Sequence, residues 1–258
     1  MKERAGIQSV EVGFALLQAL SQAPGALMLR DLAAAAGMRS AKAHRYLVSF
    51  QRLRLVVQDA SSTRYDLGPA ALKLGLASLS RLEAVKLARE RIGAWREQIG
   101  HTVALAVWGN HGPTVVHWEE SPQAVTVNLR LGDVMPLLSS ATGRCFAAYR
   151  SREAITPLLK DEIGRGVKQR RTDVPATLAQ ARSLLEEVRQ RGAARVVDTL
   201  LPGIVGFCAP VFDADGHMAL GVMALGPVGT FDAAWGGAVD GPLRAAARQL
   251  SCDLGYHG

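Results

Sequence analysis

The chain has 258 residues, which exceeds the usual size of one domain and favours two. Apolar residues make up 48% of it and charged residues 21%, as in ordinary soluble globular proteins, and no apolar run is long enough to cross a bilayer. The net charge of +7 is uneven, because residues 1–66 hold nine Lys and Arg against five Asp and Glu. A basic N-terminal segment favours a polyanionic partner, of which nucleic acid is the commonest.

The first 67 residues predict three short helices followed by a β-hairpin. Apolar residues recur at helical spacing, and turn formers separate the segments. The predicted elements are helices over 9–22, 29–36 and 40–54 and strands over 55–58 and 64–67. Ser9 and Ser40 are expected to cap their helices, and Gly37 suits the left-handed residue that ends one. In the first helix the apolar residues at helical spacing are Val10, Phe14, Leu17 and Ala19 or Leu20. The inner face of the third is expected to carry Ala43, Leu47 and Phe50.

Helix, glycine turn, basic helix and hairpin form the order of a winged helix-turn-helix. In that motif the second helix of the pair lies in the DNA major groove, where basic side chains reach phosphates and base edges. The alternative is a small three-helix domain with a basic solvated face, but topology and charge agree on DNA. The DNA-binding candidates are Arg39, Ser40, Lys42, His44, Arg45 and, on the wing, Arg64.

Two further helices, over 69–80 and 82–99, predict a linker, and we expect the domain boundary near residue 80. This gives a DNA-binding domain over 1–80 and a second domain over 81–258. Leu72, Leu76 and Leu79 form an apolar stripe that a partner helix of a second copy could cover. Because one winged helix reads only a few base pairs, we expect self-association.

The second domain alternates hairpins with helices and predicts an α+β fold with a mainly antiparallel sheet covered by helices. The predicted strands lie in 101–120, 125–131 and 204–227, and the helices begin near 141, 178 and 242. Thr177 and Gln180 are expected to form a capping box, and Gly192 to end that helix.

A polar stretch at Ser139–Gly143 precedes the helix that begins near residue 141. The first turn of a helix leaves backbone N–H groups unpaired, and the helix dipole favours negative charge there. Ala141 and Thr142 are therefore candidates to hold a carboxylate. The alternative, that Ser140 simply caps the helix, stays open on the residues alone.

Several segments together resemble the IclR family of bacterial transcriptional regulators over about residues 6–255. They are "GIQSVEVGFALLQAL", "LRDLAAAAGMRSAKAHRYL", "YDLGPAALKLG", "GDVMPLLSSATGR" and "GFCAPVFDADGHMALGVMALGP". The resemblance implies a winged helix, a linker helix and a GAF-like effector-binding domain. It also implies dimers, or dimers of dimers, on a palindromic operator.

The resemblance places the carboxylate of an effector on Ala141 and Thr142, and Ser140 is a further candidate for the effector site. Val127, Met135 and Ile204 match positions that face the effector in the family. Two departures concern its identity: Gly206 stands where many members have a cysteine, and Asp198 is the only acid in a segment that is often acidic. We expect Asp198 to accept a hydrogen bond from the effector, and Gly206 to leave room for an aromatic or other mid-sized carboxylate.

Other classes of protein remain as alternatives. A hydrolase would use Cys145, one turn into a helix, but no hydrolase, P-loop or dinucleotide motif accompanies it, and we expect no enzyme. Cys145, Cys208 and Cys252 form no C-x-x-C pair, which favours free thiols. No metal or other cofactor is expected. A non-specific nucleic-acid-binding protein would lack an effector pocket. Met1–Arg4 leads into no signal-peptide core, so we expect a cytoplasmic location.

Overall fold

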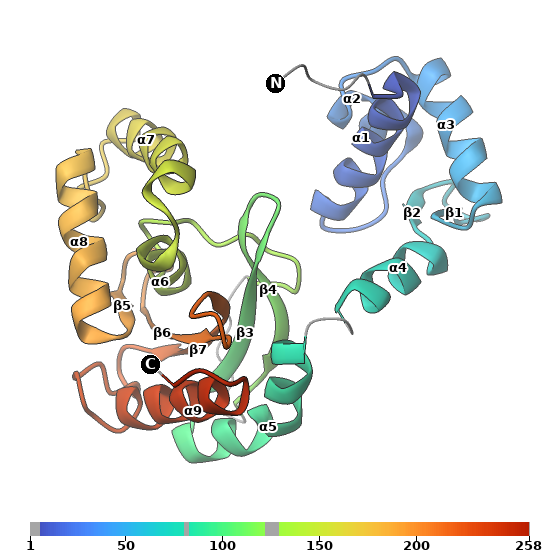
Figure 1. The fold of residues 1–258 in the computed structure, drawn as a ribbon. Helices are drawn as coiled ribbons and strands as arrows, with labels where there is room; N and C mark the ends of the chain where they lie inside the picture. The colour runs from blue at the N-terminus through green and yellow to red at the C-terminus, as the bar shows by residue number, and fades with distance from the viewer. Residues whose placement is uncertain (1–5, 80–82, 122–128, 258) are drawn as a thin grey trace. The chain divides into compact units, whose positions relative to one another are not determined.

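The computed structural model describes residues 6–79, 83–121 and 129–257. The chain forms two compact units, Met1–Leu82 and Glu83–Gly258 (Figure 1). Among the described residues, no helix combines the length and the apolar character that a membrane span requires.

The N-terminal unit is a bundle of three helices with a two-stranded hairpin, followed by a fourth helix (Figure 1). Its elements are α1 (Gln8–Gln22), α2 (Leu29–Ala35), α3 (Ser40–Arg52), β1 (Val56–Gln58), β2 (Tyr65–Leu67) and α4 (Pro69–Leu79). The strands pair antiparallel, with Val57 opposite Asp66. The order predicted from the sequence is therefore correct, with ends shifted by one or two residues.

Each helix of the bundle contributes a leucine that is fully withdrawn from solvent: Leu16, Leu32 and Leu47. The apolar spacing predicted for α1 is buried only in part, because Ala19 and Leu20 lie in the core whereas Val10 is 65% and Phe14 53% exposed. Helix α1 has apolar residues on two faces, so spacing alone does not decide which face packs. The predicted serine caps are wrong, because Ile7 and Arg39 are the N-cap residues and neither gives a side-chain cap.

The C-terminal unit is built on a five-stranded antiparallel sheet in the order β4-β3-β7-β6-β5. The strands are β3 (Thr102–Gly109), β4 (Gly112–Glu119), β5 (Ala194–Val197), β6 (Ile204–Phe212) and β7 (Met218–Pro227). The helices are α5 (Glu83–Ile99), α6 (Ala141–Tyr149), α7 (Arg152–Lys168), α8 (Leu178–Arg191) and α9 (Asp240–Asp253). The α+β architecture predicted from the sequence is confirmed.

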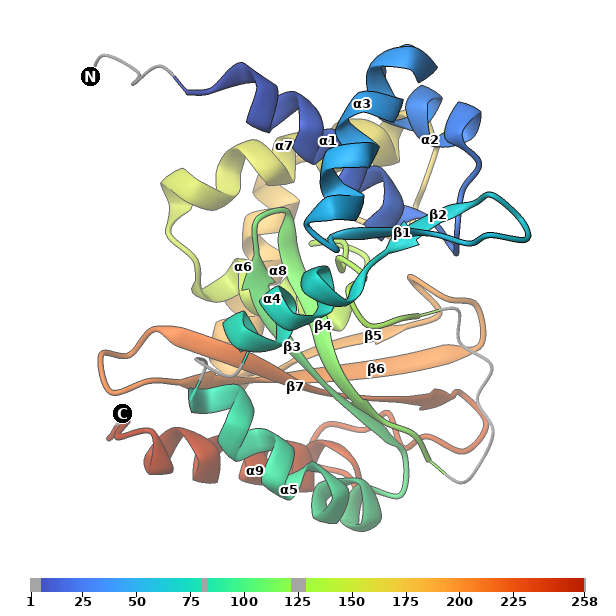
Figure 2. The same cartoon turned by 90° about the vertical axis from the view of Figure 1, so that its right-hand side faces the viewer.

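Helices cover both faces of this sheet. Figure 2 shows α5 and α9 against one face and α6 against the other, with α7 and α8 outside α6. The main core lies between α6 and the sheet, where Phe146 of α6 meets Cys208, Met223 and Leu225 of the central strands. Helix α6 therefore has an almost entirely buried surface, including its first turn.

Some elements differ from the sequence prediction. Helix α7 and strand β5 were not predicted, whereas the Thr177–Gln180 capping box and the left-handed Gly192 of α8 are confirmed. Of the strand predicted over 125–131, residues 125–128 lie outside the described part, and Leu129–Leu131 are not in a strand.

Candidate functional sites

The exposed side of α3 carries the predicted basic residues. Arg45 is two positions from both Ala43 and Leu47, which places it about 200° around the helix from these buried residues. Arg39, Lys42 and His44 are also exposed, and Ser40 is half-buried. Among the described residues, none of Arg39, Lys42 and Arg45 forms an ion pair with a carboxylate. The helix thus presents uncompensated positive charge on the side away from its core.

The turn between α2 and α3 fixes how the basic helix leaves its neighbour. Gly37 has a left-handed φ of +65°, which a glycine adopts without strain. Its N–H donates to Ala34 O at 3.0 Å, and the N–H of Met38 donates to Ala33 O at 2.9 Å. This pair of bonds satisfies the last carbonyls of α2 and ends it. The glycine turn predicted from the sequence is therefore present.

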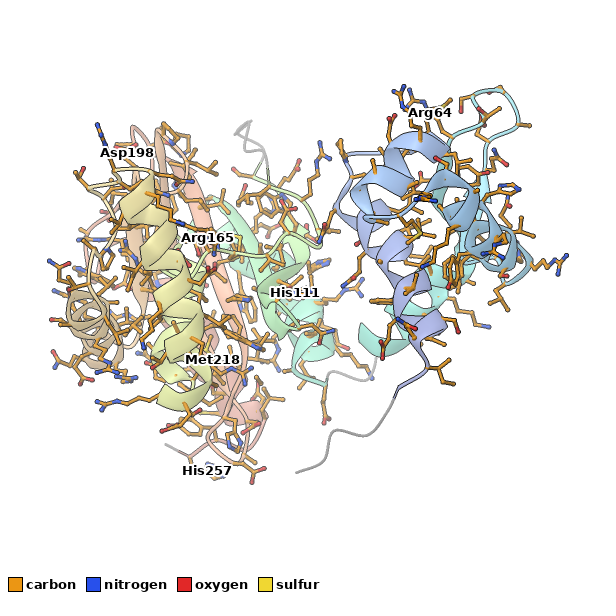
Figure 3. The ribbon with its side chains drawn as sticks, turned by 90° about the horizontal axis from the view of Figure 1, so that it is seen from above. Arg64, His111, Arg165, Asp198, Met218 and His257 are labelled. Atoms are coloured by element: carbon orange, nitrogen blue, oxygen red, sulfur yellow. The ribbon has the colours of Figure 1, made fainter. Side chains whose placement is uncertain are left out.

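The wing between β1 and β2 is held by one carboxylate. An oxygen of Asp59 accepts hydrogen bonds from the hydroxyl and backbone N–H groups of Ser61 and Ser62, at 2.6–3.1 Å. These bonds, the Ser61 hydroxyl first, hold the pKa of Asp59 well below its usual range. Arg64, labelled in Figure 3, is exposed but donates from Nη1 to Ala26 O at 3.1 Å. The wing therefore has a fixed tip, and its arginine is partly engaged within the unit.

In the C-terminal unit, most of the predicted effector residues gather around one small cavity, which we call the inner cavity. Its volume is about 40 Å³, enough for one or two water molecules. Its walls come from α6, β5, β6, β7 and the segments before α6 and β6. The lining residues are Leu129, Met135, Ser140, Ala141, Thr142, Val196, Leu200, Leu201, Ile204, Gly206, Phe207, Met223, Ala224 and Leu225.

The first turn of α6 forms the polar end of the inner cavity. Ser140 caps the helix, because its Oγ accepts from the N–H of Gly143 at 2.8 Å and donates to Pro136 O at 2.6 Å. No acceptor is found, among the described residues, for the N–H groups of Ala141 and Thr142. Ala141 is 5% and Thr142 1% exposed. A helix cap by Ser140 and a carboxylate site at Ala141 and Thr142 are therefore compatible, because the cap leaves the two buried N–H groups unpaired.

A close approach of two backbones builds this end of the cavity. A Cβ atom on Gly143 would lie 1.9 Å from Pro136 O and 2.6 Å from Leu137 Cα. Glycine at this position therefore lets the segment before α6 pass directly over the helix. The carboxylate of Glu162, on α7, accepts from the N–H groups of Leu137 and Leu138 at 2.7 and 2.9 Å. Helix α7 thereby positions the segment that leads into the first turn of α6, where the unpaired donors lie.

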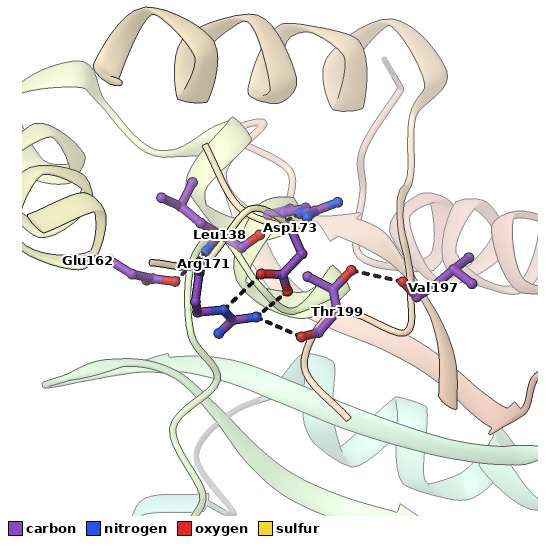
Figure 4. A network of polar contacts seen from close by, with 7 residues as sticks. Leu138, Glu162, Arg171, Asp173, Val197 and Thr199 are labelled. Carbon is purple, nitrogen blue, oxygen red and sulfur yellow. Dashed lines mark hydrogen bonds and ion pairs between the residues drawn. The ribbon is translucent and has the colours of Figure 1, made fainter. Parts of the chain in front are cut away.

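A second, larger cavity of about 430 Å³ adjoins the inner one, and we call it the outer cavity. Met135 and Leu200 line both cavities. Arg165 of α7 and His111 of the β3–β4 turn, both labelled in Figure 3, line only the outer one. Figure 4 shows hydrogen bonds at the rim of the outer cavity, where Arg171 donates to Asp173 and to the carbonyl of Thr199. The segments bearing Met135 and Leu200 are thus held by Glu162 and Arg171 respectively.

The remaining predicted effector residues lie as follows. Gly206 stands between Val196 and Leu225 in the sheet, and a Cβ on it would have Ala141 at 3.8 Å. Asp198 does not line the cavity: its carboxylate accepts from the N–H of Gly203 at 2.5 Å, across a turn in which Asp198 has φ +53°. Its short side chain is used to close this turn. Val127 lies outside the described residues.

Neither thiol nor metal chemistry has a prepared site among the described residues. Cys145 is fully buried, and burial together with the neighbouring Cys208 raises the pKa of its thiol well above the usual range. Such a thiol is a poor nucleophile. Asp213, Asp215 and His217 bring ligand atoms within 4.8 Å at the β6–β7 turn. One Asp213 oxygen already accepts from the N–H groups of the other two, which is the geometry of a tight turn.

Comparisons with known proteins agree with both units. The family model described as "IclR helix-turn-helix domain" matches residues 9–60, and "Bacterial transcriptional regulator IclR C-terminal" matches residues 76–252. The glycerol operon regulatory protein of Streptomyces coelicolor is 30% identical over 96% of this chain and 97% of its own length. The regulator KdgR of Escherichia coli is 24% identical over 99% and 96%.

Solved structures give the same result. The crystal structure of Pseudomonas aeruginosa HmgR is 38% identical, with a TM-score of 0.62 over 98% of this chain and 100% of the other. An IclR homolog from Microbacterium hydrocarbonoxydans, complexed with 4-hydroxybenzoate, has a TM-score of 0.77 at 17% identity, over 95% and 98% of the two chains. The second likeness supports the fold alone.

Proposed function

The chain belongs to the IclR family of bacterial transcriptional regulators, and from this premise we propose that it binds a palindromic operator and responds to a small organic acid. The observation that carries the DNA part is the exposed side of α3, where Arg39, Lys42 and Arg45 find no carboxylate partner among the residues that the structure describes. Uncompensated cations on a slender helix match a groove lined by phosphates. A cytoplasmic location follows, since the bacterial chromosome lies there.

Footprinting on the DNA that flanks the protein's own gene tests this proposal. We expect a discrete protected site with two-fold symmetry, and an affinity that falls steeply with salt as phosphates are neutralised. Uniform weak protection, with no preferred site, would instead favour a non-specific nucleic-acid-binding protein.

We propose that the operator is bound by a dimer or a dimer of dimers. The apolar side chains of Leu72 and Leu76 on α4 are 64% and 52% exposed, and Leu74 is 64% exposed. Apolar surface of this extent on one helix favours burial against a second copy. The side chain of Leu79, which completes the predicted stripe, is not described. Light scattering at micromolar concentration should give at least twice the monomer mass, and a monomer would contradict the proposal.

We propose that the effector's carboxylate binds the N–H groups of Ala141 and Thr142 in the inner cavity. Two buried, unpaired donors at a helix start favour an anion, and the apolar walls favour a carboxylate with a hydrophobic body. The relative complexed with 4-hydroxybenzoate shows that one protein of this fold binds an aromatic acid. An aromatic or other mid-sized acid is our candidate class.

The cavity volumes specify what such an acid must do. The inner cavity, at about 40 Å³, is too small for an aromatic ring, whereas the outer cavity reaches about 430 Å³. Drug-sized ligands occupy cavities of roughly 300–1,000 Å³. Because Met135 and Leu200 line both cavities, displacement of either side chain joins them. We therefore propose that the carboxylate sits at α6 while the body of the effector displaces Met135 or Leu200.

Two substitutions at Gly206 test the site. A Cβ there has no atom closer than 3.6 Å, so Gly206→Ala should fold and keep the response. Gly206→Leu would fill the inner cavity and should abolish effector binding while leaving operator binding intact. Titration calorimetry with aromatic and aliphatic acids measures effector binding, and a mobility shift measures operator binding. Unchanged ligand affinity in Gly206→Leu would place the effector site elsewhere.

A further inference from the structure

Three arginines and a tryptophan surround a cavity of about 150 Å³ that shares no lining residue with the inner or outer cavity. We call it the arginine cavity. Arg144 comes from α6, Arg191 from the end of α8, Arg195 from β5, and Trp235 from the segment before α9. Among the described residues that line it, Glu187 is the only acidic one. Three guanidinium groups against one carboxylate leave the cavity with a surplus of two positive charges.

Arg144 is largely withdrawn from solvent and forms no direct ion pair among the described residues, while the carboxylates of Asp173, Glu162 and Glu187 act on it only at longer range. Its guanidinium donates to two backbone carbonyls, Leu138 O at 2.7 Å and Arg195 O at 3.1 Å. No carboxylate pairs with it among the described residues, and burial lowers the pKa of Arg144. Buried charges in proteins are normally paired with an opposite charge. A sheltered arginine held only by carbonyls therefore indicates a place for an anion.

The other two arginines crowd one aromatic ring. Their guanidinium carbons lie 4.6 Å (Arg191) and 4.8 Å (Arg195) from the ring centre of Trp235. Arg191 is neutralised by Glu187, with Nε to Oε1 at 2.7 Å, whereas the Arg195 side chain donates, within the described residues, only to Ala233 O at 2.6 Å. A ring attracts a cation but does not neutralise it. Arg195 is thus a second cation without a carboxylate, beside Arg144.

We propose that the arginine cavity binds a small oxyanion, inorganic phosphate or the phosphate group of an ester. A phosphate carries about −1.5 to −2 charges at pH 7, which matches the surplus of two, and its oxygens accept from several guanidinium groups at once. The cavity volume is several times the roughly 30 Å³ that a water occupies, so one phosphate fits.

Titration calorimetry on the full-length, DNA-free protein tests this site with inorganic phosphate and phenyl phosphate, at constant ionic strength set by chloride. We expect saturable phosphate binding that Arg195→Gln weakens about tenfold or more, because charged hydrogen bonds are lost. Arg182→Gln is the matched control, since Arg182 is exposed on α8 outside the cavity and carries the same charge. It should bind phosphate like the wild type.

Tryptophan fluorescence locates the site. Phosphate should change the emission of the wild type, and Trp235→Phe should remove that change while calorimetry still detects binding. Tighter binding of inorganic phosphate identifies the free ion as the better ligand, and tighter binding of phenyl phosphate identifies an ester; either ranking supports the site. If Arg195→Gln does not fold, the more exposed Arg191→Gln carries the same test.

Three results would overturn the proposal. The first is no binding of phosphate or phenyl phosphate beyond the chloride background. The second is equal affinity in Arg195→Gln and Arg182→Gln, which would place the anion elsewhere. The third is a fluorescence change produced by duplex DNA alone that Trp235→Phe removes, which would assign the arginines to a DNA contact.

Discussion

The first turns of α3 and α6 are two helix starts with opposite designs. Around α3 the groups that we propose to bind DNA are side chains: Arg39, Lys42 and Arg45 are exposed and have no carboxylate partner in the described part of the chain. At α6 the groups that we propose to bind the effector are backbone N–H groups, and Ala141 and Thr142 are buried with small, uncharged side chains. In our proposal, the start of α3 attracts a polyanion through long-range charge. The start of α6 offers a sheltered place to one small anion through the donors that every helix start leaves unpaired.

The two designs place their structural demands differently. The basic side of α3 needs only that the opposite side, with Ala43 and Leu47, packs in a core. The start of α6 needs a glycine at 143, a cap from Ser140 and support from Glu162 on a separate helix. Core substitutions should therefore change the stability of one unit and not the other. Substitutions at the two helix starts should change one kind of binding and not the other.

The largest effect is expected from removing a core leucine. Leu47→Ala leaves a cavity in the N-terminal core, where Leu47 is fully buried, and should destabilise that unit by about 2–5 kcal/mol. Leu243→Ala, at an equally buried position on α9, is the matched change in the other unit. Hydrogen exchange should accelerate in residues 6–79 for the first variant and in residues 83–257 for the second. Equal acceleration in both units would show that they unfold together.

A smaller but more specific effect is expected at Gly143. Gly143→Ala places a Cβ 1.9 Å from Pro136 O, so the segment before α6 must shift; overpacking of this kind costs typically about 1–3 kcal/mol. The variant should also lose effector binding, because the donors of Ala141 and Thr142 move with the segment. Thermal melting and titration calorimetry measure the two effects.

Gly164→Ala on α7 is the control for Gly143→Ala. A Cβ there meets nothing within 4 Å, and alanine favours a helix over glycine, so this variant should gain roughly 0.5–1 kcal/mol. The opposite signs separate close backbone approach from helix propensity. A stabilising Gly143→Ala would contradict our account of the α6 start.

On the α3 side, removing Arg45 should weaken operator binding without affecting stability. Arg45→Ala is expected to cost roughly 1–3 kcal/mol of specific binding if the side chain contacts a base, and less sequence discrimination should remain. Arg30→Ala is the control, because Arg30 is equally charged, exposed on α2 and paired with Asp31. Mobility shifts on operator and scrambled DNA distinguish them. Equal losses on both DNAs would make Arg45 a phosphate contact only.

The contrast also explains what the sequence could predict. The basic side of α3 follows from charged residues at helical spacing next to the buried Ala43 and Leu47. The six DNA candidates therefore lie on this helix, at its start or, for Arg64, on the wing. The first turn of α6 was predicted from Ser139–Gly143, but its support was not. Helix α7 was missed because Pro157, Gly164 and Gly166 interrupt its pattern, and Glu162 was missed with it.

Other misses have a common cause in tertiary context. Leu200, Leu201 and Met223 line the inner cavity because strands distant in the sequence pair in one sheet, and spacing within a segment does not show this. Asp198 was expected to reach the effector as the only acid in its stretch. Its left-handed backbone and its bond to Gly203 N–H use it in a turn instead, and alternation of apolar residues gives no signal of that geometry.

The smallest expected effect is a pH dependence of stability, which comes from one carboxylate in each unit. These are Asp59 in the wing and Asp232 in the segment before α9, and N–H groups bind both. The hydroxyls and N–H groups of Ser61 and Ser62 lower the pKa of Asp59 below the 3.8 of an unfolded chain, so its ionised form stabilises the folded wing. A lowered folded pKa gives stability that is fully present above about pH 4 and is lost as pH falls below it. Asp59→Asn keeps the shape but not the charge, so it should melt lower than the wild type at pH 6 and approach it toward pH 2. The pKa of Asp232 is also lowered, by the N–H groups of Ala234 and Ala238, so Asp232→Asn should show the same trend in the C-terminal unit.

Hydrogen exchange followed during melting measures the stability of each unit, and so the effect of each variant. A difference between Asp59→Asn and the wild type that grows as pH falls would reverse the sign and show that the Asp59 carboxylate is not what holds the wing.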